Sequence, residues 1–193
     1  WMWPCKNKGE DARLYQAVNA ASDFACKLGI NIPTGKDSLY MTQKYPDGNV
    51  VYSPGTIIAS AVGEVENVKK IVTPNLKWIN NTNILYIDLS SDDFKLGGSC
   101  FAQTKNMLGN ETPTINDTIY FKKVFNAIQY LINNQKILAG HDISAGGMIT
   151  SLLEMTFAEN QIGLDINLSS IKEKDINKII VVNGPGSFTG IRI

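Results

Sequence analysis

The longest amphipathic pattern lies near the start of the chain and predicts a helix over residues 9–28. Its apolar positions recur every three or four residues, as the core-facing side of a helix requires. Glu10 and Asp11 fall in the first turn, where negative charge stabilises the helix dipole, and Gly29 is a typical terminator. The side expected to face the core comprises Leu14, Val18, Ala21, Ala25 and Leu28.

Two further helices are predicted in the second half of the chain. Asp117 or Thr118 is placed to cap a helix that runs to about residue 133, because short polar side chains accept hydrogen bonds from the free N–H groups of a first turn. A shorter helix is predicted over residues 148–158. Their core-facing residues are Phe121, Val124, Phe125, Ile128 and Leu131 in the first, and Leu152, Leu153 and Met155 in the second.

Short apolar and β-branched runs between these helices predict strands. Residues 39–44 precede a strong turn signal at 45–49, so a strand entering a hairpin is expected there. Small and β-branched residues over 56–65 predict a buried strand, and two more are expected at 84–89 and 137–139. Strands that alternate with helices indicate an α/β or α+β protein.

Composition narrows the class of protein. Hydrophobic residues are 44% and charged residues 19%, which is globular, and 18 Lys+Arg against 18 Asp+Glu give a net charge of zero. A neutral chain is not expected to bind nucleic acid or an anionic membrane broadly, and no apolar run approaches the ~20 residues of a membrane span. Three dispersed cysteines without a CxxC pair indicate a reducing compartment, expected to be the cytoplasm, and no zinc site.

The ends and the middle of the chain suggest how it is organised. A polar stretch with Lys69, Lys70 and Pro74 indicates a connector and a domain boundary. The chain begins with Trp1 rather than Met and stops at Ile193 without a terminating signal, so we expect a piece of a longer protein.

The loop at residues 33–38 is the first candidate for chemistry. Gly35 would let backbone approach a ligand, Lys36 offers a point charge for phosphate, and Ser38 offers a hydroxyl. The spacing of a P-loop is absent, and an ordinary surface loop is the commoner outcome for so short a motif. The residues alone leave both interpretations open.

The second candidate is the loop at residues 141–147, between a predicted strand and a predicted helix. Asp142 is a hard oxygen ligand suited to Mg²⁺, which favours one or two carboxylates together with phosphate oxygens. Ser144 would bond a phosphate oxygen, and the following helix start would favour an anion. The alternative is that Asp142 and Ser144 simply cap the helix. His141, the only histidine, is by base rate more often structural than catalytic.

Four motifs together carry a family resemblance. The segments 1–4, 9–15, 32–38 and 140–147 occur in one order with natural spacing. Together they resemble the phosphoribosylformylglycinamidine synthase family of purine biosynthesis, over residues 1 to about 175. Four motifs in register are far more specific than any one of them.

The resemblance implies a fold and a domain plan. The fold class would be α/β plus α+β: the end of an AIR-synthase-like N-terminal, barrel-forming domain followed by an AIR-synthase-like C-terminal domain. On this plan residues 1–70 are the C-terminal part of the first domain and 71–82 the connector. Residues 83–176 are the second domain, truncated, and 177–193 a foreign tail.

The resemblance also implies an activity for the parent enzyme. That activity is the ATP-dependent, glutamine-dependent amidation of formylglycinamide ribonucleotide to formylglycinamidine ribonucleotide, a carbon–nitrogen ligase reaction. ATP activates the amide oxygen as a phosphate ester, and ammonia released from glutamine in a separate domain displaces the phosphate. The implied cofactors are ATP/ADP and Mg²⁺. The other synthase half and the glutaminase domain are missing, so the piece is expected to be inactive alone.

Site residues follow from the motif matches, and none of them is expected to be catalytic. Family members often carry an acidic residue where this chain has Ala145, a departure that would weaken a contact around Asp142 without removing it. The matched residues are Asp142 for Mg²⁺, Ser144 and Gly35 for nucleotide, and Lys36, Asp37 and Ser38 for substrate or phosphate.

The end of the chain departs from that family. Residues 179–193, with their Gly-Pro-Gly turn, resemble the TsaB family, which acts in threonylcarbamoyladenosine modification of tRNA. This resemblance implies a non-catalytic partner protein as the alternative function, and a chimeric junction near residue 178. So short a tail cannot bury its own core. We expect a poorly packed end or a strand added to the preceding domain.

Overall fold

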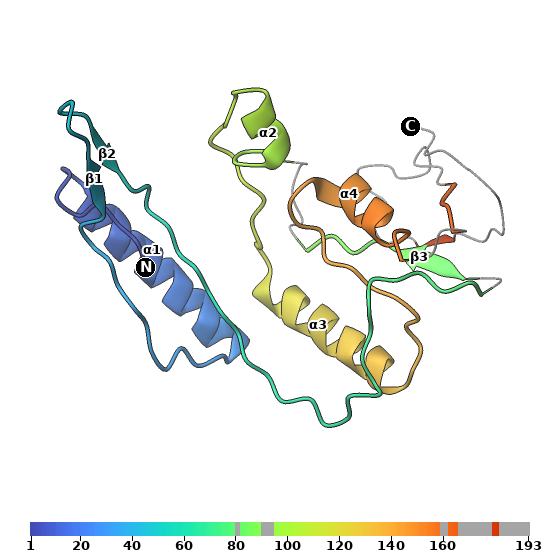
Figure 1. The fold of residues 1–193 in the computed structure, drawn as a ribbon. Helices are drawn as coiled ribbons and strands as arrows, with labels where there is room; N and C mark the ends of the chain where they lie inside the picture. The colour runs from blue at the N-terminus through green and yellow to red at the C-terminus, as the bar shows by residue number, and fades with distance from the viewer. Residues whose placement is uncertain (80–81, 90–94, 159–161, 166–178, 182–193) are drawn as a thin grey trace. The chain divides into compact units, whose positions relative to one another are not determined.

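The computed structural model describes residues 1–79, 82–89, 95–158 and 162–165, and the backbone of 179–181 (Figure 1). The chain divides into two units, Trp1–Glu66 and Asn67–Ile193. Across these described residues, no helix combines the length and the apolarity needed to cross a membrane. The domain boundaries expected from the sequence, at residues 70, 82 and 176, stay predictions.

Helix α1, Glu10–Leu28, is the main element of the first unit and confirms the predicted helix. Gly29 ends it at φ 76°, a left-handed conformation that glycine adopts without a steric penalty. Ala25 and Leu28 are buried on its inner side. Val18, predicted on that same side, is exposed. A helix face is buried only where another element covers it.

The predicted hairpin is also present. Strand β1, Thr42–Lys44, pairs antiparallel with strand β2, Val50–Tyr52. The turn between them is closed by a backbone hydrogen bond of 2.9 Å from Tyr45 N to Asn49 O. The Oδ1 atom of Asp47 accepts from the same Asn49 backbone at 3.0 Å. Turn-forming side chains therefore fix this register locally.

The first five residues thread between two other segments. Met2 exchanges backbone hydrogen bonds of 2.9 and 2.8 Å with Thr56, and Trp3 N donates to Ser38 O at 2.9 Å. Trp3 is only 5% exposed and belongs to the core of this unit. Beyond Thr56, residues 57–65 are exposed and form no strand. The predicted buried strand over 56–65 is therefore wrong, because a strand needs a pairing partner that its own residues do not supply.

The second unit contains a short helix α2, Cys100–Thr104, and the longer α3, Thr118–Asn133. Asp117 caps α3 through its Oδ1 atom, which accepts from Ile119 N at 2.9 Å and Tyr120 N at 2.8 Å. This confirms the predicted helix and one of its two candidate caps. No residue of α3 is buried, and Phe125, predicted to face the core, is exposed.

Two short strands of this unit pair although they are far apart along the chain. Strand β3, Asn83–Leu85, is antiparallel to β4, Ile179–Val181, with Ile84 opposite Ile180. The strand predicted at 84–89 thus begins where expected and is shorter. The strand predicted at 137–139 does not form. The addition of β4 agrees with one of the two outcomes expected for the end of the chain.

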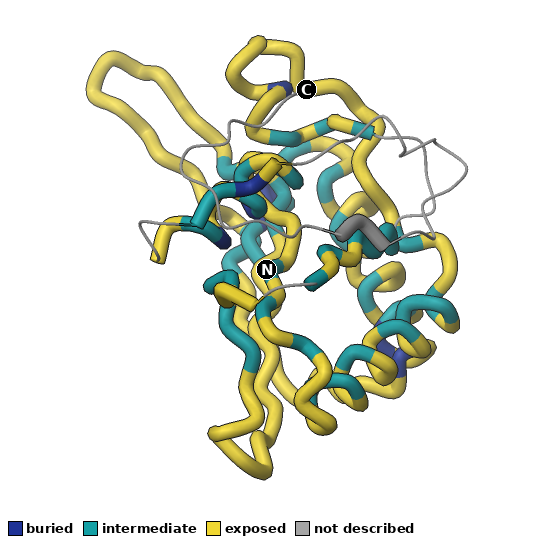
Figure 2. Tube along the Cα trace, turned by 90° about the vertical axis from the view of Figure 1, so that its right-hand side faces the viewer, coloured by how far each residue is buried: buried dark blue, intermediate teal, exposed yellow. Residues whose placement is uncertain are grey.

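Helix α4, Gly147–Glu154, follows the candidate loop directly and ends earlier than the predicted 148–158. Figure 2 shows how few residues of the described chain are buried. Those of this unit include Ser151, Met155 and Leu164, whereas Leu153, predicted inward, is exposed. Met155 O accepts from Leu76 N at 3.0 Å, so part of the predicted connector is hydrogen-bonded into this unit.

Candidate functional site

The loop at residues 33–38 belongs to the first unit and is exposed throughout, apart from half-buried Ser38. Its backbone is fixed at Ser38, whose N–H donates to Trp1 O at 2.8 Å. The Nζ atom of Lys36 lies 2.5 Å from Ser38 Oγ and 3.4 Å from Asp37 O. The structure thus brings the predicted lysine and serine together, with their polar atoms toward solvent.

Gly35 is not required by local geometry. A Cβ at this position would meet the Trp1 ring at 3.9 Å, which is ordinary contact, and its φ is not positive. The predicted role of Gly35 in nucleotide binding therefore gains no support from strain or crowding, and stays a prediction.

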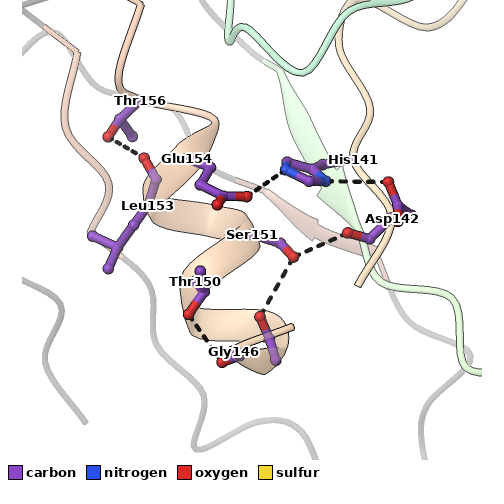
Figure 3. A network of polar contacts seen from close by, with 9 residues as sticks. His141, Asp142, Gly146, Thr150, Ser151, Leu153, Glu154 and Thr156 are labelled. Atoms are coloured by element: carbon purple, nitrogen blue, oxygen red, sulfur yellow. Dashed lines mark hydrogen bonds and ion pairs between the residues drawn. The ribbon is translucent and has the colours of Figure 1, made fainter. Parts of the chain in front are cut away.

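The second candidate loop leads directly into α4 (Figure 3). Gly146 is the N-cap at φ 90°, and no side chain caps this helix. The Gly147 N–H donates to the Ser144 carbonyl at 3.0 Å. Asp142 and Ser144 therefore do not cap α4, and the helix-cap alternative for them is wrong. The exposed side chains of both remain available to a ligand.

His141 sits between two carboxylates. Its Nε2 atom lies 2.7 Å from Glu154 Oε2, and its Nδ1 atom lies 3.5 Å from Asp142 Oδ1. Since a carboxylate only accepts, Nε2–H is the donor to Glu154. The imidazole is 17% exposed, whereas the Asp142 carboxylate is 86% exposed.

The surroundings of His141 favour its charged form. Partial desolvation lowers the pKa of His141. The hydrogen bond to Glu154, the bond with the Asp142 backbone and the two negative charges raise it more, so the pKa lies above its ordinary value. The raised pKa and the contact with Glu154 favour a charged imidazole, and the structural role expected for His141 stays a prediction.

Ser151 connects the loop to α4 by a side-chain hydrogen bond. It is 5% exposed, and its Oγ atom lies 3.0 Å from the backbone oxygen of Asp142 and 3.4 Å from that of Gly147. Sequence reasoning missed both Ser151 and Glu154. The available signal was a polar residue on the inner side of an otherwise apolar helix, which needs a partner when it is buried.

The donor set suits a shared rather than a self-contained metal site. Among the residues that the structure describes, no three or more His, Cys, Asp or Glu side chains gather as metal ligands. Asp142 offers one exposed carboxylate, beside the His141 imidazole. That fits Mg²⁺ held by a carboxylate and by phosphate oxygens of a nucleotide, with further ligands from outside these residues. The other candidate loop, at 33–38, lies in the other unit.

Two protein families match the chain in sequence. Residues 1–64 match the FGAR-AT PurM_N-like domain, and residues 89–183 match the AIR synthase related protein, C-terminal domain. Both domains are of the AIR-synthase type, which confirms the predicted fold class. The second match also extends past residue 177, where the tail was predicted to begin.

Several curated proteins are similar over most of the chain. A probable phosphoribosylformylglycinamidine synthase of Arabidopsis thaliana, named chloroplastic/mitochondrial, is 42% identical over 171 residues, 88% of this chain and 12% of that protein. A probable phosphoribosylformylglycinamidine synthase of Caenorhabditis elegans is 41% identical over 191 residues, which make up 91% of this chain and 14% of that protein. The phosphoribosylformylglycinamidine synthase of Dictyostelium discoideum is 40% identical over 188 residues, which make up 94% of this chain and 14% of that protein. The chain thus spans 12–14% of the length of these relatives.

Proposed function

Because this chain belongs to the phosphoribosylformylglycinamidine synthase family, we propose that it supplies a nucleotide-binding part of such a synthase. The parent reaction would be the ATP- and glutamine-dependent amidation of formylglycinamide ribonucleotide. The observation that carries the proposal is the loop at 141–147, which leads into α4 and presents an exposed Asp142 carboxylate.

The proposed roles follow the chemistry of each side chain. Asp142 would bind Mg²⁺, which when bound neutralises phosphate charge. Ser144 would donate its hydroxyl to a phosphate oxygen. Lys36, with Asp37 and Ser38, would bind a substrate or nucleotide phosphate through the ammonium group. Gly35 would let the nucleotide approach the backbone in the same loop.

The proposed partners are the remaining parts of a synthase, because the chain spans so little of its relatives. Ile58 and Val62 lie in the exposed 57–65 segment, where a folded protein normally covers such side chains. We propose that this segment is the barrel-forming part of the first domain, and that the chain is inactive alone. All three cysteines are free, which supports a reducing compartment such as the cytoplasm.

Calorimetry with Mg-ADP tests the nucleotide proposal. The purified 193-residue chain should show saturable binding. Asp142→Asn should weaken it about tenfold or more, because the amide cannot replace a charged Mg²⁺ ligand. Asp23→Asn is the matched control, since it removes a carboxylate of another exposed aspartate, in α1. The absence of binding by a folded chain, or equal effects of the two substitutions, would overturn the proposal.

For residues 179–193 the TsaB-like resemblance and the chimeric junction stay proposals. Residues 182–193 lie outside the part of the chain that the structure describes, and the AIR synthase related match extends to residue 183. Amplification of one genomic fragment across codons 150–193, followed by sequencing, tests the junction. A continuous product supports a genuine fusion, and two separate loci would show that the junction does not exist in the cell.

A further inference from the structure

We propose that Ser151 and Glu154 are positioning residues for Asp142, which they hold by two separate anchors on α4. The proposal rests on the proposed function, since it assigns these residues to the ligand-binding loop. Neither residue is expected to touch the ligand. Ser151 would hold the backbone of Asp142, and Glu154 would hold the neighbouring His141, before any ligand binds.

The first anchor is the Ser151 hydroxyl. A serine inside a helix usually returns its hydrogen bond to the carbonyl four residues earlier, as Thr150 does to Gly146 O at 2.9 Å. Ser151 has that option with Gly147 O at 3.4 Å, but Asp142 O is closer at 3.0 Å. A hydroxyl has a single proton, so the shorter contact identifies the main acceptor. The bond therefore leaves the helix and fastens the loop.

The second anchor is the Glu154 carboxylate, three residues further along α4. Residues with this spacing lie on one side of a helix, so both anchors face the loop. Glu154 accepts from His141 Nε2 at 2.7 Å, and the other nitrogen of the same ring faces the Asp142 carboxylate. Figure 3 shows the imidazole between the two acidic side chains. The loop is thus attached to α4 at residue 142 through Ser151 and at residue 141 through Glu154.

The two anchors restrain the backbone of Asp142 but not its carboxylate. Its backbone carbonyl is bonded while its carboxylate is 86% exposed, so the backbone is restrained and the side chain remains open to solvent. Pre-organisation of this kind strengthens binding by reducing the ordering cost. Among the described residues Ser151 is the one polar side chain that is buried, which marks its bond as costly to lose.

A pair of nearly isosteric substitutions separates this role from simple packing. Ser151→Thr keeps the hydroxyl, and Ser151→Val replaces it by a methyl group in almost the same shape. Thr150→Val is the control, because its hydroxyl bonds only to the N-cap residue Gly146 and not to Asp142. For the second anchor, Glu154→Gln keeps an acceptor oxygen and Glu154→Leu has none.

Amide hydrogen exchange of the metal-free chain is the first readout. Ser151→Val and Glu154→Leu should speed exchange over residues 142–147 about five- to tenfold relative to Ser151→Thr and Glu154→Gln, with α3 as the internal reference. Thr150→Val should leave exchange at residues 142–145 unchanged. Equal exchange in Ser151→Thr and Ser151→Val, or equal acceleration in α3 and the loop, would overturn the proposal.

Mg-ADP calorimetry is the second readout. Ser151→Val should raise the dissociation constant about fivefold and Ser151→Thr less than twofold. A loop that loosens in Ser151→Val without any change in affinity would overturn the positioning role. Failure of the wild-type chain to bind Mg-ADP would instead overturn the proposed function, while the exchange data would still decide whether the two anchors exist.

Discussion

The indole ring of Trp3 lies directly against the backbone of Gly55, so closely that a Cβ at residue 55 would come within 2.6 Å of the ring. Real Cβ atoms do not approach carbon atoms at that distance. Trp3 is one of the buried residues of its unit, and its ring also lies 5.9 Å from the Arg13 guanidinium in a cation–π arrangement. Glycine at residue 55 is therefore a packing requirement.

We expect Gly55→Ala to destabilise the first unit by about 1–3 kcal/mol, because the ring or the backbone must shift to admit the methyl group. Urea denaturation followed by tryptophan fluorescence measures this. Gly63→Ala is the control, since no atom lies within 4 Å of a Cβ there. Equal destabilisation by the two substitutions would contradict the close packing.

Asp117→Ala should reduce stability by about 1 kcal/mol and shorten α3, because two N–H groups of its first turn lose their acceptor. Far-ultraviolet circular dichroism during thermal unfolding provides the measurement. Asp117→Asn retains an acceptor oxygen and should lose much less. If alanine and asparagine behave alike, the side-chain cap contributes nothing.

The pairing of His141 with Glu154 predicts a pH dependence. The pKa of His141 is raised in the folded chain, so its stabilising contribution is complete below the unfolded value of 6.5 and is lost as pH rises through the folded pKa. Glu154→Gln should lower the His141 pKa and remove most of this dependence. Proton NMR reports it directly, since the chain has one histidine. A His141 pKa that does not change in Glu154→Gln would contradict the pairing.

Gly146→Ala should destabilise the loop before α4 more than Gly147→Ala does. Both glycines have positive φ, which costs an alanine about 1–2 kcal/mol. At Gly146 a Cβ would also collide with the Thr150 side chain, whereas at Gly147 no atom lies within 4 Å. The additional loss should be about 1 kcal/mol or more.

A double-mutant cycle isolates that collision. Thr150→Ala removes the Oγ1 and Cγ2 atoms but keeps the Cβ atom, which would lie 2.8 Å from a Cβ at residue 146, so it should recover part of the additional loss in the Gly146→Ala background. Chemical denaturation of the four chains gives the coupling free energy. Strict additivity would show that the collision plays no part.

Local signals in the sequence predicted the helices and the hairpin well. α1 and α3 have helical spacing and end signals within their own residues, and the hairpin turn is closed by Asp47 and Asn49. The strands predicted at 56–65 and 137–139 were wrong because pairing depends on distant segments. The same β-branched run is compatible with a strand only when another edge lies beside it.

The sequence predicted the residues of the candidate loop but not the hydrogen bonds that join this loop to α4. The residues at 141–147 indicated a carboxylate and a hydroxyl that could bind a ligand. The structure then showed that Asp142 does not cap α4. Ser151 and Glu154 were missed because their significance depends on which side of α4 faces the loop. That relationship exists only once the loop has folded back onto the helix.

The pairing of Leu85 with Ile179 sets an order of events during synthesis. Residues 1–66 form a unit of their own and are translated before either strand of this pair. Strand β3 leaves the ribosome early as well, but its partner emerges only after α3 and α4. At about 5–20 residues per second, the β3 edge waits several seconds unpaired. During that interval it is open to association with other nascent chains, so slower translation of this stretch would increase the need for chaperones.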